Sequence, residues 1–323
     1  MNLQPASAKS RLVSIVVPAF NEAEGIAAFI ERLIAALRDC EFEFEIWIVD
    51  DGSKDDTWAR VCAEGVRYPQ LHGLRFTRNF GKEAAILAGL RHARGDAVVV
   101  MDADGQHPPA LLSDMLAIWR GGSAQIVAAT KAERNTDSWT TRLNAQIFNR
   151  MMKWLAGLDL ANASDFRLLD RRVVDALLKF PEKIRFFRGM TVWTGFATRE
   201  ISFEVAPRIA GNSQWNSAQL TRLAINAITA YSAKPLGLIF RLGLIGMVAA
   251  AALLVQALYS WYLNVAVSGW TSLTIVILFF GSANMLGIGV LGVYLAHIFD
   301  EIKGRPEFLI QERLVDGGQS NPD

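Results

Sequence analysis

The chain has 323 residues, of which 33 are Lys or Arg and 32 are Asp or Glu, so its formal net charge at pH 7 is +1. A charge this close to zero lacks the basic surface that nucleic-acid-binding proteins carry, so we expect no nucleic acid as a partner. Hydrophobic residues make up 51% of the chain, which is enough for a membrane part. Cys40 and Cys62 show no metal-ligand spacing and fit a reducing compartment.

The first two thirds of the chain alternate between strand-like and helix-like patterns. Apolar, β-branched runs predict strands at about residues 12–18, 44–50, 72–76, 96–101 and 124–129. The first of these runs lacks a signal-peptide cleavage pattern, so we interpret it as a strand. Helical patterns lie between the strands, at about 22–38, 54–66, 81–93 and 109–119. We therefore expect an α/β fold with a mostly parallel sheet, helices on both faces, and ligands at the carboxyl ends of the strands.

Charged side chains follow three of the predicted strands: Asp50 and Asp51, Arg78 and Lys82, Asp102 and Asp104. Nearby polar residues have a structural alternative, because Asn21 with Glu24 and Ser53 with Asp56 match the spacing of a helix capping box. Capping does not explain the paired carboxylates, since a cap needs only one short acceptor. Like charges so placed repel each other unless a cation or a donor-rich ligand joins them.

The segment Asp102-Ala103-Asp104 predicts a site for a divalent cation that carries a diphosphate. Mg²⁺ or Mn²⁺ prefers few protein oxygens in such sites and completes its octahedron with phosphate oxygens and water. The carboxylates of Asp102 and Asp104 and the amide oxygen of Gln106 suit that need. We interpret His107, which precedes two prolines at a helix start, as structural or as a neighbour of the metal site rather than as a general base.

Motifs along nearly the whole chain resemble one enzyme family. The motifs read VVPAFNE, VDDGSKDDT, RNFGKEAAILAGL and MDADGQHPP, followed by SDFRLLDRRVVDAL, RFFRGMTVWTGF and RIAGNSQWN. In this order they resemble the family 2 glycosyltransferases, and within them the branch that includes dolichol-phosphate mannose synthases and bactoprenol glucosyltransferases. The resemblance implies a GT-A-like nucleotide-sugar-binding domain, a metal-dependent transferase activity and, from membrane relatives, a homo-oligomer.

The resemblance also implies roles for individual residues. It assigns the nucleotide base and ribose to Pro18, Phe20, Glu22, Asp50 and Asp51. It places Arg78 and Lys82 near the nucleotide phosphates and Asp102, with Ala103, on the ribose or phosphate side. Asp104 and Gln106 would bind the metal, with Asp102 beside them.

Two apolar segments near the C-terminus predict transmembrane helices. They extend over about residues 242–263 and 273–299, and each exceeds the roughly 20 residues that cross a bilayer core. Small residues in the second segment, among them Gly287, favour close contact between helices. A pair of buried core helices is the alternative.

Basic residues flank this predicted pair of spans. Lys234 and Arg241 precede the first span, and Lys303, Arg305 and Arg313 follow the second, whereas the connection between the spans has no basic residue. By the positive-inside rule both ends of the pair are cytoplasmic. We therefore expect a multi-pass protein of the inner membrane whose large N-terminal domain is cytoplasmic.

These patterns divide the chain into four predicted parts. They are a GT-A-like domain over 1–215, a juxtamembrane interfacial helix over 216–235, two transmembrane helices within 236–300, and a cytoplasmic tail over 301–323. The amphipathic pattern of the second part also fits a helix packed within a domain.

A cytoplasmic sugar-nucleotide site on a membrane-anchored chain predicts a polyprenyl phosphate acceptor. Its phosphate is mostly ionised near neutral pH, since the second pKa is about 6, so it needs cationic positioning more than a base. The candidate cations are Arg134, Arg185 and Arg188, with Arg167 and Arg208 as weaker ones. Asp165 is the residue we expect beside the acceptor, as a base or as the orienter of an arginine; a salt bridge to Arg167 or Arg171 is its structural alternative.

The expected activity is an inverting transfer of a sugar, with UDP-glucose favoured as donor, to undecaprenyl phosphate for modification of the cell envelope. A mannose synthase that uses GDP-mannose is the alternative. A processive polysaccharide synthase fits less well, because Leu223 follows Gln219-Leu-Thr-Arg222 where such enzymes carry tryptophan. A non-catalytic membrane scaffold or lipid-flipping partner conflicts with the intact acidic motifs.

Overall fold

The computed structural model describes residues 11–38, 41–105, 107–131, 163–183, 185–203, 234–263, 269–315 and 318–320. The chain separates into two compact units. We call Met1–Ala145, Leu158–Gln214 and Pro306–Asp323 the sheet unit, and Gln146–Gly157 with Trp215–Arg305 the helical unit. The expected boundary near residue 215 and the expected interfacial helix over 216–235 lie outside the described residues, apart from the start of the first apolar helix.

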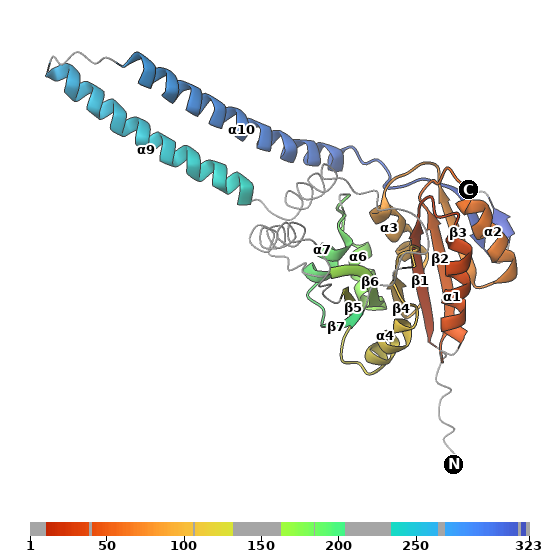
Figure 1. Cartoon of the computed structure of the whole chain (residues 1–323). Helices are drawn as coiled ribbons and strands as arrows, with labels where there is room; N and C mark the ends of the chain where they lie inside the picture. The colour runs from red at the N-terminus through yellow and green to blue at the C-terminus, as the bar shows by residue number, and fades with distance from the viewer. Residues whose placement is uncertain are drawn as a thin grey trace. The chain divides into compact units, whose positions relative to one another are not determined.

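Four parallel strands form the centre of the sheet unit (Figure 1). They are, in spatial order, β4 (Ala97–Val100), β1 (Leu12–Ala19), β2 (Glu43–Asp50) and β3 (Leu71–Phe76). All residues of β4 are buried and so are most of β1 and β2, as expected for strands that are covered on both faces. The sequence predicted these four strands within one or two residues at each end.

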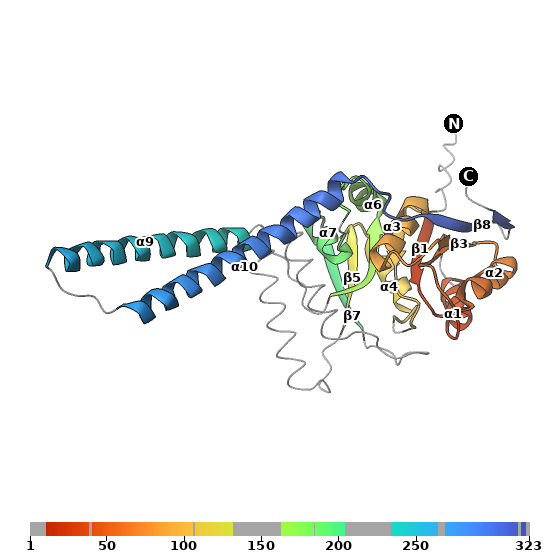
Figure 2. The same ribbon diagram turned by 90° about the horizontal axis from the view of Figure 1, so that it is seen from above.

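Helices cover both faces of this sheet (Figure 2). The helices are α1 (Ile26–Arg38), α2 (Thr57–Arg67), α3 (Lys82–His92), α4 (Leu111–Arg120), α6 (Arg171–Leu178) and α7 (Phe187–Trp193). One face packs on α1, α2 and α4, whose apolar residues share a core with Ile15 and Val17 of β1. The opposite face of β1 contacts α3, where Gly89 lies directly against Val16. A larger side chain than glycine would not fit there, because an added Cβ would lie 2.2 Å from Val16 Cγ1.

The outer strands turn the parallel centre into a mixed sheet of nine strands within the described residues, in the order β7-β5-β6-β4-β1-β2-β3-β8-β9. The additions are β5 (Ile126–Lys131), β6 (Ala163–Asp170), β7 (Thr198–Phe203), β8 (Ile310–Val315) and β9 (Gly318–Ser320). Strand β6 runs antiparallel to both β4 and β5, and β8 runs antiparallel to β3. Part of the segment expected to be a tail, 301–323, therefore belongs to the sheet.

The helical unit contains two long apolar helices that lie side by side, α9 (Lys234–Tyr262) and α10 (Trp270–Ile302) (Figures 1 and 2). Both are long and apolar enough to cross a membrane over Ile239–Ser260 and Val276–Ile302, and neither window is buried. Gly246 faces Phe280, and Gly287 faces Ile239 on the opposite helix. These contacts match the expected use of small residues between the helices. The lack of burial argues against the alternative of core helices.

Candidate active site

The strand register brings the predicted site residues to one edge of the sheet. Ala19 at the end of β1 lies opposite Asp50 at the end of β2. Val100 at the end of β4 lies opposite Val16, so the loop that follows β4 begins at the same edge. The carboxyl ends of parallel strands meet here, where α/β proteins bind ligands.

The loop after β1 is bound to the loop after β2. The Asn21 N–H donates to Ser53 Oγ at 2.8 Å, and the Lys54 N–H donates to Asn21 Oδ1 at 3.0 Å. The Glu22 N–H donates to Thr57 Oγ1 at 2.9 Å. The capping-box alternative for Ser53 and Asp56 is wrong, because Asp56 at the start of α2 makes no side-chain cap. These side chains join two loops instead.

Two of the residues assigned to the nucleotide, Pro18 and Phe20, lie where β1 ends and the loop after it begins. Phe20 is 37% exposed, so part of this residue is open to solvent. Pro18 forms part of β1, opposite Val49 of β2.

Arg78, predicted to lie near the nucleotide phosphates, contacts its neighbours in the loop after β3. Its guanidinium lies 4.1 Å from the centre of the Phe80 ring and donates to the Asn79 carbonyl.

Asp51 fixes the loop that leads into α3. Its two carboxylate oxygens accept the N–H groups of Phe80 at 2.7 Å and Gly81 at 2.9 Å. Burial raises the pKa of Asp51 to about 6, although these two N–H groups act in the opposite direction. Since Lys82 follows Gly81 directly, Asp51 positions the first turn of α3.

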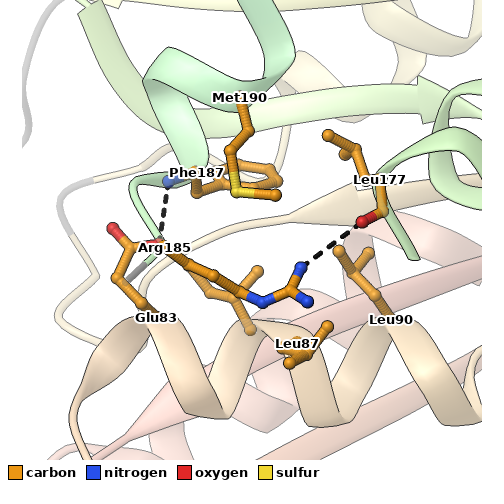
Figure 3. Close-up of a pocket in the computed structure, with 8 residues that line it drawn as sticks. Glu83, Leu87, Leu90, Leu177, Arg185, Phe187 and Met190 are labelled. Atoms are coloured by element: carbon orange, nitrogen blue, oxygen red, sulfur yellow. Dashed lines mark hydrogen bonds between the residues drawn. The ribbon is translucent and has the colours of Figure 1, made fainter. Parts of the chain in front are cut away.

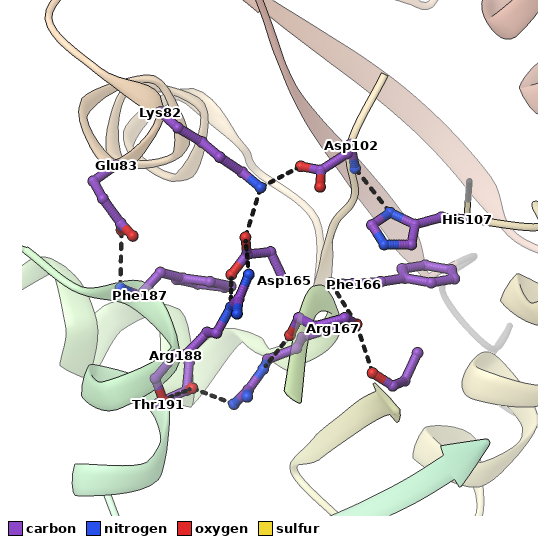
Figure 4. Close-up of polar contacts among 12 residues, drawn as sticks. Lys82, Glu83, Asp102, His107, Asp165, Phe166, Arg167, Phe187, Arg188 and Thr191 are labelled. Carbon is purple, nitrogen blue, oxygen red and sulfur yellow. Dashed lines mark hydrogen bonds and ion pairs between the residues drawn. The ribbon is translucent and has the colours of Figure 1, made fainter. Parts of the chain in front are cut away.

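Four charged side chains from four elements meet beside this edge (Figure 4). Lys82 Nζ lies 2.5 Å from Asp102 Oδ1 and 2.6 Å from Asp165 Oδ2. Arg188 of α7 binds Asp165 with two nitrogens, Nε to Oδ1 at 2.6 Å and Nη2 to Oδ2 at 3.0 Å. We call Lys82, Asp102, Asp165 and Arg188 the charge cluster. It joins predicted donor-side residues to predicted acceptor-side residues.

Asp165 is the buried centre of the charge cluster, with a side chain that is 7% exposed. Burial raises its pKa, but Lys82 and Arg188 outweigh that effect and hold the pKa well below its usual range. Burial likewise lowers the pKa of Lys82, and the charges of Asp102 and Asp165 more than reverse the effect. Both groups are therefore ionised at neutral pH. The expected alternative partners of Asp165 are wrong, because Arg167 donates to Ser164 O and Thr191 Oγ1, while Arg171 binds carbonyls of Ala93 and Gly95.

Glu83 is a site residue that the sequence analysis missed. Its Oε2 accepts the Phe187 N–H at 2.8 Å, which attaches the first turn of α7 to α3 (Figure 4). Burial, and then the negative charge of Asp165, raise the pKa of Glu83 to about 7. The signal that could have found it is its place directly after Lys82 in RNFGKEAAILAGL.

Arg185, a predicted acceptor ligand, is instead engaged with the protein itself. Its side chain is 7% exposed and lines a cavity of about 20 Å³ between α3, α6 and α7 (Figure 3). It donates to the carbonyls of Leu177 and Phe180 and to Glu307 Oε1. The cavity holds about one water molecule, so it cannot accept a substrate. Arg188 is the predicted arginine that reaches Asp165.

The acidic loop after β4 supplies part of the predicted metal site. Asp102 is 28% exposed, and its N–H donates to His107 Nδ1 at 3.2 Å. Within the part of the chain that the structure describes, no group of three or more His, Cys, Asp or Glu side chains could hold a metal ion. Asp102 and Asp104 are two carboxylates on this loop, and a cation bound there would need further oxygens, such as those of a diphosphate and water. Ala103, between them, is buried. Gln106, Arg134 and Arg208 lie outside the described residues.

The model of one protein family, Glycosyl transferase family 2, matches residues 14–178. This range includes the candidate site residues from Pro18 to Asp165. The chain belongs to this family. The prophage bactoprenol glucosyl transferase homolog of Escherichia coli strain K12 is 37% identical over 303 residues, which are 93% of this chain and 98% of that relative. The bactoprenol glucosyl transferase of Shigella phage SfII is 36% identical over 305 residues, covering 93% and 97%.

A solved structure confirms the fold of this glycosyltransferase. The glucosyl-3-phosphoglycerate synthase of Mycobacterium tuberculosis, in complex with Mn²⁺, UDP and phosphoglyceric acid, matches with a TM-score of 0.52 and 22% identity. The match covers 68% of this chain and 76% of that chain. The sheet unit is therefore GT-A-like, and the family 2 glycosyltransferase carries two apolar helices besides.

Proposed function

We propose that this family 2 glycosyltransferase transfers a sugar from a nucleotide sugar, with UDP-glucose favoured, to a membrane polyprenyl phosphate such as undecaprenyl phosphate. The observation that carries the proposal is the likeness to bactoprenol glucosyl transferases over 93% of the chain. That length includes the two apolar helices as well as the sheet unit. A polyprenyl-phosphate sugar made at the cytoplasmic face would serve modification of the cell envelope.

The charge cluster suits an anionic acceptor. An oxygen of the acceptor phosphate attacks the anomeric carbon, the bond from that carbon to the diphosphate breaks, and the configuration inverts in one displacement. Because the phosphate is already ionised near neutral pH, it needs cations to place it. Lys82 and Arg188 are two cations that share Asp165, Lys82 also binds Asp102, and both cations are at least one third exposed.

Asp165 acts in this proposal as the orienter of those cations and not as a base. Its pKa lies well below the usual range because Lys82 and Arg188 hold it ionised. So acidic a carboxylate binds a proton too weakly near pH 7 to serve as a general base. Asp102 binds Lys82 from the donor side, so in this proposal the Lys82 ammonium lies between the nucleotide sugar and the acceptor phosphate.

Asp102 and Asp104, with Gln106, are the residues that would hold Mg²⁺ or Mn²⁺. When bound, such a cation would neutralise charge on the departing nucleoside diphosphate. The chain's own contribution is the pair of carboxylates on the loop after β4 and the nucleotide contacts proposed for Pro18, Phe20, Glu22, Asp50, Asp51 and Arg78.

The strand β8 supports the proposed membrane topology. The chain leaves the sheet after β7 and returns to the same sheet as β8, with α9 and α10 between them in sequence. If each helix crosses the bilayer, two crossings bring the chain back to the side from which it left. Together with the basic flanks, this supports the proposal that the sheet unit of an inner-membrane enzyme lies on the cytoplasmic side.

The donor is identified by incubating membranes that contain the protein with undecaprenyl phosphate and a panel of labelled nucleotide sugars. We expect a lipid-extractable labelled product that requires Mg²⁺ or Mn²⁺ and forms best from UDP-glucose. Label from GDP-mannose instead would identify the mannose synthase alternative. Asp104→Ala should lower product formation by at least about 100-fold, whereas Lys179→Met, an exposed residue outside the site, should leave it unchanged. No lipid product from any donor would refute the proposal.

A further inference from the structure

The segment after α10 returns to the sheet unit and contacts the donor side of the site. Phe308 stacks on Phe76 of β3, with ring centres 5.0 Å apart, and β8 then pairs with β3 along its length. Leu314 of β8 is buried in the core beside Gly65 and Gly73. The C-terminal segment is therefore part of the folded sheet unit.

Glu312 of β8 binds two side chains from different elements. Its Oε1 lies 2.7 Å from Arg75 Nη1, and its Oε2 accepts the indole N–H of Trp58 at 2.9 Å. Arg75 in turn lies beside the predicted nucleotide residue Asp50, with Nε 3.7 Å from Asp50 Oδ2. One guanidinium is thus shared between a carboxylate of the C-terminal segment and a carboxylate of the site.

The carboxylate of Asp50 is buried beside the Arg75 guanidinium. Its side chain is fully buried, and Oδ1 accepts the Ser53 N–H, whereas Oδ2 makes no hydrogen bond to a described residue. Burial raises the pKa of Asp50, and the bonds from Ser53 and the charge of Arg75 oppose it. A buried carboxylate without a compensating cation destabilises the fold or becomes protonated. Asp50 therefore acts through the loop that it holds at the Ser53 N–H, and Arg75 is the cation beside it.

We infer that Glu312 is a positioning residue for the donor site, because it holds the Arg75 guanidinium against Asp50, the carboxylate that fixes the loop after β2. The inference rests on the proposed role of the loop after β2, which begins with Asp50 and Asp51, in nucleotide binding. It makes the segment after the second apolar helix part of the donor site, although the family model match ends at residue 178. Removing the Glu312 charge leaves Arg75 free to turn toward solvent, because its side chain is already 27% exposed.

Glu307 offers a matched control from the same segment. Its carboxylate binds Arg185 and Arg91 instead of Arg75. Glu307→Gln thus weakens the attachment of the C-terminal segment without touching Arg75. A merely structural role of this segment predicts the same effect for both variants.

The test measures UDP affinity of the purified full-length protein by calorimetry with Mn²⁺, and the melting temperature of each variant. We expect Glu312→Gln to weaken UDP binding by about tenfold, the size of a lost hydrogen bond to a charged group. Glu307→Gln should change it by less than about twofold. Against an Arg75→Met background, Glu312→Gln should add less than about twofold, because the residue through which it acts is gone. In transfer assays the effect should raise KM for the donor and leave KM for the lipid unchanged.

Equal losses of UDP affinity in Glu312→Gln and Glu307→Gln, or an undiminished effect of Glu312→Gln in the Arg75→Met background, would overturn the inference and leave the proposed function intact. A wild-type protein that binds no sugar nucleotide would overturn both. If Glu312→Gln does not fold, Arg75→Lys tests the same contact, because lysine keeps the charge but lacks the fork that reaches two carboxylates. Wild-type UDP affinity in Arg75→Lys would then count against the inference.

Discussion

Asp165 shows how one buried carboxylate organises charges that lie far apart in the sequence. It accepts from Lys82, 83 residues away, and from Arg188, 23 residues away. The sequence indicated that Asp165 belongs to the site, but its neighbours Arg167 and Arg171 were the partners that short spacing favoured. Pairing across β6, α3 and α7 depends on the tertiary fold, and no local pattern reveals it.

The buried carboxyl group of Glu83 predicts how stability depends on pH. Its pKa is raised from 4.5 to about 7 by burial and by Asp165, so the folded protein holds more protons than the unfolded chain between these pH values. Stability therefore falls as pH rises through this window, by at most about 3 kcal/mol. We expect the melting temperature of the wild type to fall from pH 5 to pH 7.5, and that of Glu83→Gln to fall less.

The difference between the two proteins isolates Glu83, because Asp50 and Asp51, whose pKa values are also raised, titrate in both. Glutamine keeps an oxygen for the Phe187 N–H, so the attachment of α7 remains. Parallel pH profiles of the melting temperature would show that Glu83 is not the group responsible.

At the scale of elements, the loops after β2 and β3 are packed in contact. Gly52 has a φ of +68°, and an added Cβ would lie 2.4 Å from the carbonyl carbon of Arg78. Because this carbon belongs to the backbone, one of the two loops must move to admit any side chain. The nucleotide residues proposed on both loops would move with it.

Gly52→Ala should therefore lower both stability and UDP affinity. The left-handed backbone alone costs an alanine about 1–2 kcal/mol, or a few degrees in melting temperature. Gly122→Ala is the matched control, because Gly122 has a φ of +69° with open space around it. We expect both variants to lose stability and Gly52→Ala alone to lose UDP affinity, measured by calorimetry. Equal UDP affinity in the two variants would contradict the packing argument.

The central strands and helices could be predicted from the sequence because their apolar runs and helical periods are local. The outer strands could not be predicted in this way. Strand β8 has the mixed sequence IQERLV, and its partner β3 lies more than 200 residues earlier, with two apolar helices between them. The segment 164–177 carries one of the family motifs, but the motif does not show that its first half is an antiparallel strand. That follows from the pairing of β6 with β4 and β5.

At the scale of the whole molecule, the chain combines a GT-A-like sheet unit with a pair of apolar helices. A strand from the C-terminal part of the chain, β8, joins the sheet next to β3. This arrangement suits the proposed function, in which the donor is dissolved in water and the acceptor is held in the bilayer. The helices expose large apolar side chains along their length, among them Phe240, Ile245, Phe279 and Leu286, which lipid would cover. The homo-oligomer expected from the resemblance stays a prediction.

The most direct test of this account compares undecaprenyl phosphate with undecaprenol as acceptors for the purified protein, with labelled UDP-glucose and Mn²⁺. The proposed role of the charge cluster is to position an anionic acceptor, so we expect labelled lipid from undecaprenyl phosphate and none above background from undecaprenol. Equal labelling of both lipids, or release of free glucose with no labelled lipid, would contradict it.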